Sequence, residues 1–69
     1  MKDEEKIKKI EKMRTKLAQI RMDLVGVMED ETYDVLERGW AVINNIETAA
    51  YLLMQLKHIF EMRRLGDEK

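Results

Sequence analysis

The fold is decided by residues 10–27, IEKMRTKLAQIRMDLVGV, in which apolar side chains recur at steps of three and four. Residues 42–60, VINNIETAAYLLMQLKHIF, repeat this spacing. Such spacing places one apolar stripe along each of two helices, at positions a and d of a seven-residue repeat. Positions a hold Ile10, Leu17 and Leu24, then Ile46, Leu53 and Phe60; positions d hold Met13, Ile20 and Val27, then Val42, Ala49 and Leu56. The sequence therefore predicts an all-α fold, a two-helix hairpin.

The boundaries of the two helices follow from the acidic, stripe-free stretch between them. The expected elements are a first helix at about 3–28, an acidic turn at about 29–33 and a second helix at about 34–65. Asp3 is expected to cap the first helix, and Gly66 to end the second. Together they form a single domain, 1–69, although residues 30–38 could instead form a separate short helix.

A chain of 69 residues needs a source of stability beyond its own core. It has no cysteine for disulfides and a single histidine, which leaves association with another chain. The second helix is also apolar beside its stripe, at Ile43 and Leu52, so it is expected to be buried on more than one side. We therefore expect a homodimeric four-helix bundle, with a heteromeric bundle as the alternative. The predicted dimer core is Ile10, Met13, Leu17, Ile20, Leu24, Val42, Ile46, Ala49, Leu53, Leu56 and Phe60.

The charges along the chain indicate how two hairpins would stack. Residues 1–21 carry a net charge of +4, residues 22–47 a net charge of −6 and residues 48–69 a net charge of +1. A hairpin brings its two basic ends together and places the acidic turn at the opposite tip. Because stacking in opposite directions sets each acidic tip beside the partner's basic end, we expect an antiparallel bundle.

The composition also limits the class of protein. The chain is 45% hydrophobic, which is too apolar for a disordered tail. Its most hydrophobic window, 41–60, contains asparagine, glutamate and lysine, so no membrane span is expected. The first six residues, five of them charged, lack the apolar core of a signal peptide. With no cysteine, the chain fits a reducing compartment, and we expect a cytoplasmic protein.

The residues that could carry chemistry do not form a recognisable catalytic set. All-helical nucleotide pyrophosphatases hold magnesium with paired carboxylate motifs on two helices, whereas the first helix here offers only Glu11 and Asp23. His58, with Glu61 three residues on, lacks a visible nucleophile. We therefore predict no enzyme activity, catalytic residue, cofactor or metal. The acidic cluster, read as a solvated turn, is Glu29, Asp30, Glu31, Asp34 and Glu37.

Basic residues of the first helix suggest a second binding function, in which the protein contacts nucleic acid. The predicted architecture is similar in shape to small antiparallel helical-hairpin dimers that bind structured RNA, although no sequence motif carries this resemblance. Acidic residues between the lysines favour an ordinary charged surface instead. The candidate contacts to nucleic-acid phosphates are Lys9, Lys12, Arg14, Lys16 and Arg21.

Aromatic and methionine side chains of the second helix suggest contacts with a protein partner. In the assigned repeat, Tyr51 and Met54 point away from the stripe, while Tyr33 and Trp40 flank the start of the helix. These four are the candidate partner contacts. The favoured function is a small non-enzymatic interaction or regulatory protein that binds another protein as a homodimer, and the alternative is a nucleic-acid-binding dimer.

Overall fold

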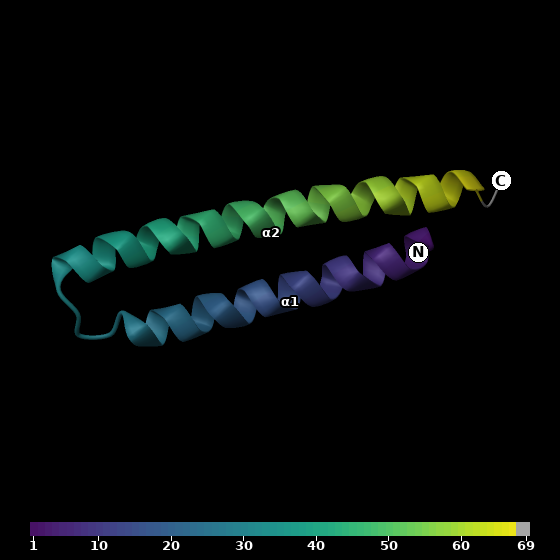
Figure 1. Ribbon diagram of the computed structural model, residues 1–69. Coiled ribbons are helices and arrows are strands. Elements are labelled where there is room, and N and C mark those ends of the chain that lie inside the picture. Colours follow the sequence, from purple (N-terminus) through teal and green to yellow (C-terminus); the bar gives the residue numbers. More distant parts are fainter. Residues whose placement is uncertain (68–69) are drawn as a thin grey trace.

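The computed structural model describes residues 1–67, and its fold is a hairpin of two long helices (Figure 1). Helix α1 spans Asp3–Val27 and helix α2 spans Tyr33–Asp67. The helices lie side by side and antiparallel in a rod of 56 × 15 × 13 Å, with the start of α1 and the end of α2 at the same end. The prediction of an all-helical hairpin is confirmed. Residues 68 and 69 of the predicted domain lie outside the described residues.

Helix α1 begins with three acidic residues, 3–5, where the helix dipole favours negative charge. The prediction that Asp3 caps this helix is wrong. The cap position falls on the extended residue Lys2, whose carbonyl accepts the Lys6 N–H at 3.1 Å, and no side chain caps the helix. Asp3, already inside the first turn, instead faces two cations: Lys6 Nζ at 3.7 Å and Arg63 Nε at 3.5 Å.

The turn is short and closes through the backbone. The Met28 N–H donates to the Leu24 carbonyl at 3.0 Å, which completes the last turn of α1. Asp30 then adopts a left-handed conformation with φ 57°, a region that aspartate tolerates better than most residues. The Leu36 N–H donates to the Thr32 carbonyl at 3.0 Å and starts α2.

Helix α2 is continuous through two glycines. Residues 33–38 form its first turns, so the separate helix considered for 30–38 is not observed. The prediction that Gly66 ends the helix is wrong, because α2 continues to Asp67. Glycine ends helices by adopting a positive φ, and Gly66 does not.

The two helices meet along positions a and e of the repeat. Ile10, at position a, is 5% exposed, while Met28 and Ile43, both at position e, are 6% and 1% exposed. Gly39 makes room for this contact, because a Cβ atom there would lie 2.5 Å from the Met28 Sδ. The hairpin therefore buries one edge of each apolar stripe, and the d positions lie next to this contact, outside the core.

The residues predicted for the dimer core are mostly uncovered within one chain. Of these eleven, only Ile10 is buried. Those that are half-buried are Leu17, Leu24, Ile46, Ala49, Leu53 and Phe60. Those that are exposed are Met13, Ile20, Val42 and Leu56. All four exposed residues are at position d.

Candidate protein-interaction surface

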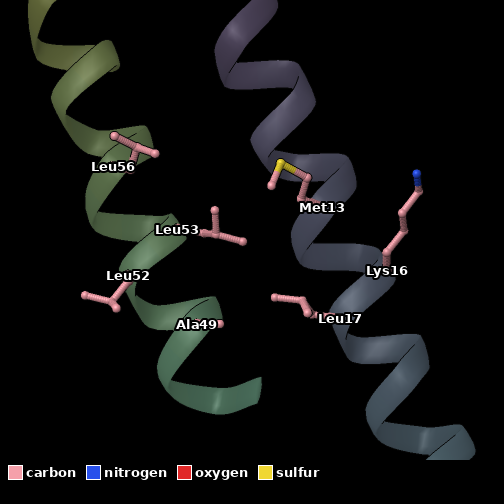
Figure 2. A pocket seen from close by; sticks show the side chains of 7 residues that line it. All are labelled: Met13, Lys16, Leu17, Ala49, Leu52, Leu53 and Leu56. Carbon is pink, nitrogen blue, oxygen red and sulfur yellow. The ribbon is translucent and has the colours of Figure 1, made fainter. Parts of the chain in front are cut away.

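A shallow apolar groove of about 540 Å³ runs between the helices near the middle of the hairpin. Its lining residues are Met13, Lys16, Leu17, Ala49, Leu52, Leu53 and Leu56. Figure 2 shows Leu17 and Leu53 pointing toward one another across the space between the helices, whereas Lys16 points away from α2. Six of the seven lining residues are apolar, so the groove offers little to a polar ligand and much to another apolar surface.

A second groove continues this surface toward the turn. It is lined by Leu24, Val27, Met28, Val35, Arg38, Gly39 and Val42. Leu24 lies seven residues from Leu17, and Val42 lies seven from Ala49, so both grooves are on the same side of each helix. Ile20, which is 51% exposed, stands between them. We call this continuous surface, formed by positions d, g and a of both helices, the d face.

The exposed area of the chain is large for its mass. The chain of 8.3 kDa exposes 5656 Å², whereas a compact monomer of that mass exposes about 4,600 Å². The surplus of roughly 1,000 Å² is comparable with the roughly 800 Å² that each partner buries in a stable protein interface. The hairpin as a whole therefore leaves about as much extra surface exposed as one partner buries in such an interface, and the d face is an apolar, grooved part of that surface.

The opposite side of the hairpin is closed by ion pairs between the helices. The Arg21 Nε lies 3.2 Å from the Glu47 Oε1, and the Lys57 ammonium contacts the Glu11 carboxylate. The hydrogen bond from Lys57 is the main cause that lowers the Glu11 pKa below its ordinary value of 4.5. Desolvation opposes it, and the charges of Lys57 and Arg14 add to the lowering. This polar side, which we call the ion-pair flank, contrasts with the d face.

The four predicted partner contacts are all exposed, but the structure brings only two of them together. Tyr51 and Met54 share a groove formed entirely by α2, in which the Gln55 Nε2 donates to the Tyr51 hydroxyl at 3.0 Å. The other residues lining this groove are Gln55, Lys57, His58, Ile59 and Glu61. Trp40 lies eleven residues before Tyr51, about 16 Å along the helix, and Tyr33 is farther still.

The five predicted nucleic-acid contacts do not share one face. Lys9, Lys12 and Lys16 are exposed. Arg14 and Arg21 occupy e positions and turn toward the ion-pair flank, where the Arg14 Nη1 lies 3.7 Å from the Glu11 Oε1. The basic surface of α1 is therefore split, and two of its cations are already engaged within the hairpin.

The acidic turn provides no ready metal geometry. Among residues 1–67, no three histidine, aspartate or glutamate side chains are grouped as a metal site would require. His58 is exposed in the α2 groove. Neither helix, as far as the chain is described, contains an apolar window long enough to cross a membrane.

Two apolar side chains that line the grooves of the d face, Leu52 and Val35, were not among the residues predicted for the stripe. Leu52 lines the central groove from position g, and Val35 lines the groove near the turn from position d, one repeat before Val42. The signal for Val35 was present in the sequence as the same seven-residue step. Leu52 was visible as an apolar neighbour of the stripe.

Comparison of the chain with protein-family models, with curated proteins and with solved structures finds no match.

Proposed function

We propose that this hairpin is one half of a homodimeric four-helix bundle, and that the dimer acts as a small, non-enzymatic interaction protein of the cytoplasm that binds another protein. The observation that carries the proposal is the d face, in which an apolar surface runs along both helices with most of its d side chains exposed. A surface of this kind is stabilised when a second apolar surface excludes water from it.

Stability within a single chain favours association. Ile10, Met28 and Ile43 are the only buried apolar side chains in the described residues. A core of three side chains is small for a domain of this length, and domains of this size commonly gain stability by oligomerisation. A second hairpin on the d face would add Met13, Ile20 and the leucines of the central groove to the core.

The chain is also complementary to itself. Residues 1–21 carry a net charge of +4 and residues 48–69 a net charge of +1, while Glu29, Asp30 and Glu31 lie in the turn that joins the helices. A second copy with its turn at the opposite end places each acidic turn beside the partner's net-basic segments. Two copies with their turns at the same end would instead place like charges together, so the antiparallel homodimer is favoured. A different partner that supplies the other two helices would need the same distribution of charge.

The groove formed entirely by α2, which contains Tyr51 and Met54 and is called the outer groove from here on, is the surface that a dimer would leave for another protein. Tyr51 and Met54 face away from α1, and neither lies at an a or d position, so dimerisation through the d face leaves them accessible. Aromatic and methionine side chains combine apolar area with adaptable packing, as protein interfaces require.

The solution mass measured by size-exclusion chromatography with light scattering tests the dimer. A mass near twice 8.3 kDa is expected. Ile20→Asp, on the d face, should give a monomer or an unfolded chain, while Met22→Asp, on the outward side of α1 and 66% exposed, should leave the dimer intact. A folded wild-type monomer at all concentrations would overturn the proposal.

The binding proposal needs a separate test. Once a protein partner is captured, Tyr51→Ala with Met54→Ala should weaken its binding while the dimer mass is retained. Full binding by this double variant would exclude the outer groove.

Nucleic-acid binding is the second candidate, and the exposed lysines of α1, which include Lys9, Lys12 and Lys16, favour it. It predicts binding to double-stranded RNA that weakens steeply with added salt and with Lys12→Glu. A titration unaffected by either change would remove this candidate.

A further inference from the structure

We infer that the two hairpins stack with their turns at opposite ends in one defined register, in which α1 packs antiparallel against α1 of the second copy and Lys16 faces the partner's Asp23. This inference rests on the proposed homodimer. It identifies the occupant of the d face as a second copy of this chain and specifies which residues meet.

The apolar side chains of α1 set the register. In an antiparallel pair of helices, an a residue of one helix lies in a layer with a d residue of the other. Pairing Leu17 with the partner's Ile20 also pairs Leu24 with the partner's Met13. This follows because, in antiparallel helices, moving seven residues forward along one helix corresponds to moving seven residues back along the other. All four positions are half-buried or exposed within one chain, so each has surface left to contribute.

The same register pairs opposite charges beside these layers. Positions g of two antiparallel helices face each other, and the g positions of α1 include Lys16 and Asp23. With Leu17 opposite the partner's Ile20, Lys16 lies opposite the partner's Asp23, and two-fold symmetry repeats the pair. Both side chains are exposed, and Lys16 points away from α2 (Figure 2).

Neither residue is already neutralised within the hairpin. In the described part of the chain, Lys16 and Asp23 take part in no ion pair, and the Asp23 Oδ1 accepts a single hydrogen bond from the Gln19 Nε2 at 2.9 Å. Arg14 and Arg21, at the e positions, are paired within the chain. The charges left over on α1 therefore include a complementary pair at the spacing that an antiparallel copy requires.

The opposite arrangement, with both turns at the same end, lacks this complementarity. In that arrangement α1 would lie over the partner's α2. Each residue of α1 would then lie at the same height along the rod as it does beside α2 within one hairpin. The Arg21–Glu47 contact fixes those heights and sets Lys16 level with Leu52, and Asp23 level with Asn45. Lys16 would then meet an apolar side chain, and the two acidic turns would lie side by side.

Disulfide cross-linking distinguishes the two arrangements, because the natural chain has no cysteine to interfere. The double variant Met13→Cys with Leu24→Cys should form a covalent dimer on mild oxidation, since these positions share a layer. Within one chain they are eleven residues apart on α1, about 16 Å, which is too far for a disulfide. Each single variant should remain uncross-linked.

Two outcomes of this experiment would overturn the register. Efficient cross-linking of Met13→Cys alone would contradict the register, in which Met13 lies opposite the partner's Leu24 and about 16 Å along the helices from its own copy. A double variant that has the mass of a dimer and forms no disulfide would exclude the proposed layers. A monomeric mass for the wild-type chain would instead remove the homodimer itself, so the two failures are distinguishable.

Exchange of charge provides a second test that leaves the apolar core untouched. Lys16→Asp and Asp23→Lys should each weaken dimerisation roughly two- to tenfold, the range of exposed ion pairs repeated by symmetry, and the combined exchange should restore the wild-type dissociation constant within about twofold. Lys12→Asp, an equal change of charge at an outward position of α1, is the control. Additive weakening in the combined exchange would overturn the proposed pair.

Discussion

Met28 packs so closely on Gly39 that a Cβ atom on the glycine would lie 2.5 Å from the Met28 Sδ. This contact joins the residue that follows α1 to the second turn of α2, and it sets how near the helices approach beside the turn. Met28 is among the few buried side chains of the described chain, so moving it aside would cost part of its burial.

Gly39→Ala is therefore expected to destabilise the protein, by about 1 kcal/mol. Alanine gains about 1 kcal/mol over glycine in a helix, but forcing the buried methionine from its place costs about 1–3 kcal/mol. Urea unfolding at fixed protein concentration measures the balance. In a Met28→Ala background the obstacle is removed, and the same Gly39→Ala change should become stabilising by about 1 kcal/mol. A stabilising effect in both backgrounds would mean that Met28 yields freely.

Gly26→Ala is expected to stabilise the protein by about 0.5–1 kcal/mol, the difference in helix propensity. Gly26 lies within α1 with no positive φ, and a Cβ atom there meets nothing within 4 Å. The free energy of unfolding in urea, compared with that of Gly39→Ala, separates helix propensity from packing. A loss of stability here would place an unseen neighbour, such as a second chain, against this position.

Asp30→Gly is expected to stabilise the turn by roughly 0.5 kcal/mol, because glycine adopts the left-handed region at φ 57° without steric cost. Asp30→Val should lose about 1 kcal/mol or more for the opposite reason. Asp30→Asn removes the charge and keeps a side chain that tolerates this conformation, so it serves as the control in the same thermal unfolding measurement. Equal stability of the glycine and valine variants would contradict the backbone argument.

Acid should weaken the contact between α1 and α2 through Glu11. Its lowered pKa, due first to the hydrogen bond from Lys57, means that the folded state favours the ionised carboxyl. The contribution to stability is thus complete above the ordinary pKa of 4.5 and is lost as the pH falls through the lower, folded-state value.

Glu11→Gln removes this titration. The urea midpoint of the wild type should exceed that of Glu11→Gln at pH 7, and the difference should shrink by pH 3. Glu37→Gln, on the outward side of α2, is the matched control. A difference that stays constant with pH would show that Glu11 acts through packing and not through its charge.

The two helices could be predicted because their apolar residues recur every seven positions over long segments. The face by which each helix contacts the other could not be predicted, because each apolar stripe is wider than one neighbouring helix can cover. Ile43 and Met28 are buried at position e, while Met13 and Ile20 at position d remain exposed. The pattern defines which side chains avoid water, whereas the side that meets the second helix depends on close packing such as that of Met28 on Gly39.

The ends of the helices were less predictable than their existence. Asp3 and Gly66 are good capping residues by type, yet the backbone at Lys2 and the negative φ of Gly66 move the boundaries. For the candidate surface, Tyr51 and Met54 could be placed together because they are three residues apart. The engagement of Arg14 and Arg21 could not be foreseen, because it depends on which face of α1 meets α2.

The ion-pair flank limits how large an assembly of this protein can grow. Each hairpin has a d face on one side and, on the other, the Arg21–Glu47 and Lys57–Glu11 pairs. When two d faces cover each other, both ion-pair flanks face the solvent. Adding a further hairpin there would bury charged side chains, which costs free energy. We therefore expect a closed, finite particle, in contrast to the open-ended filaments that form when a subunit is adhesive on both sides.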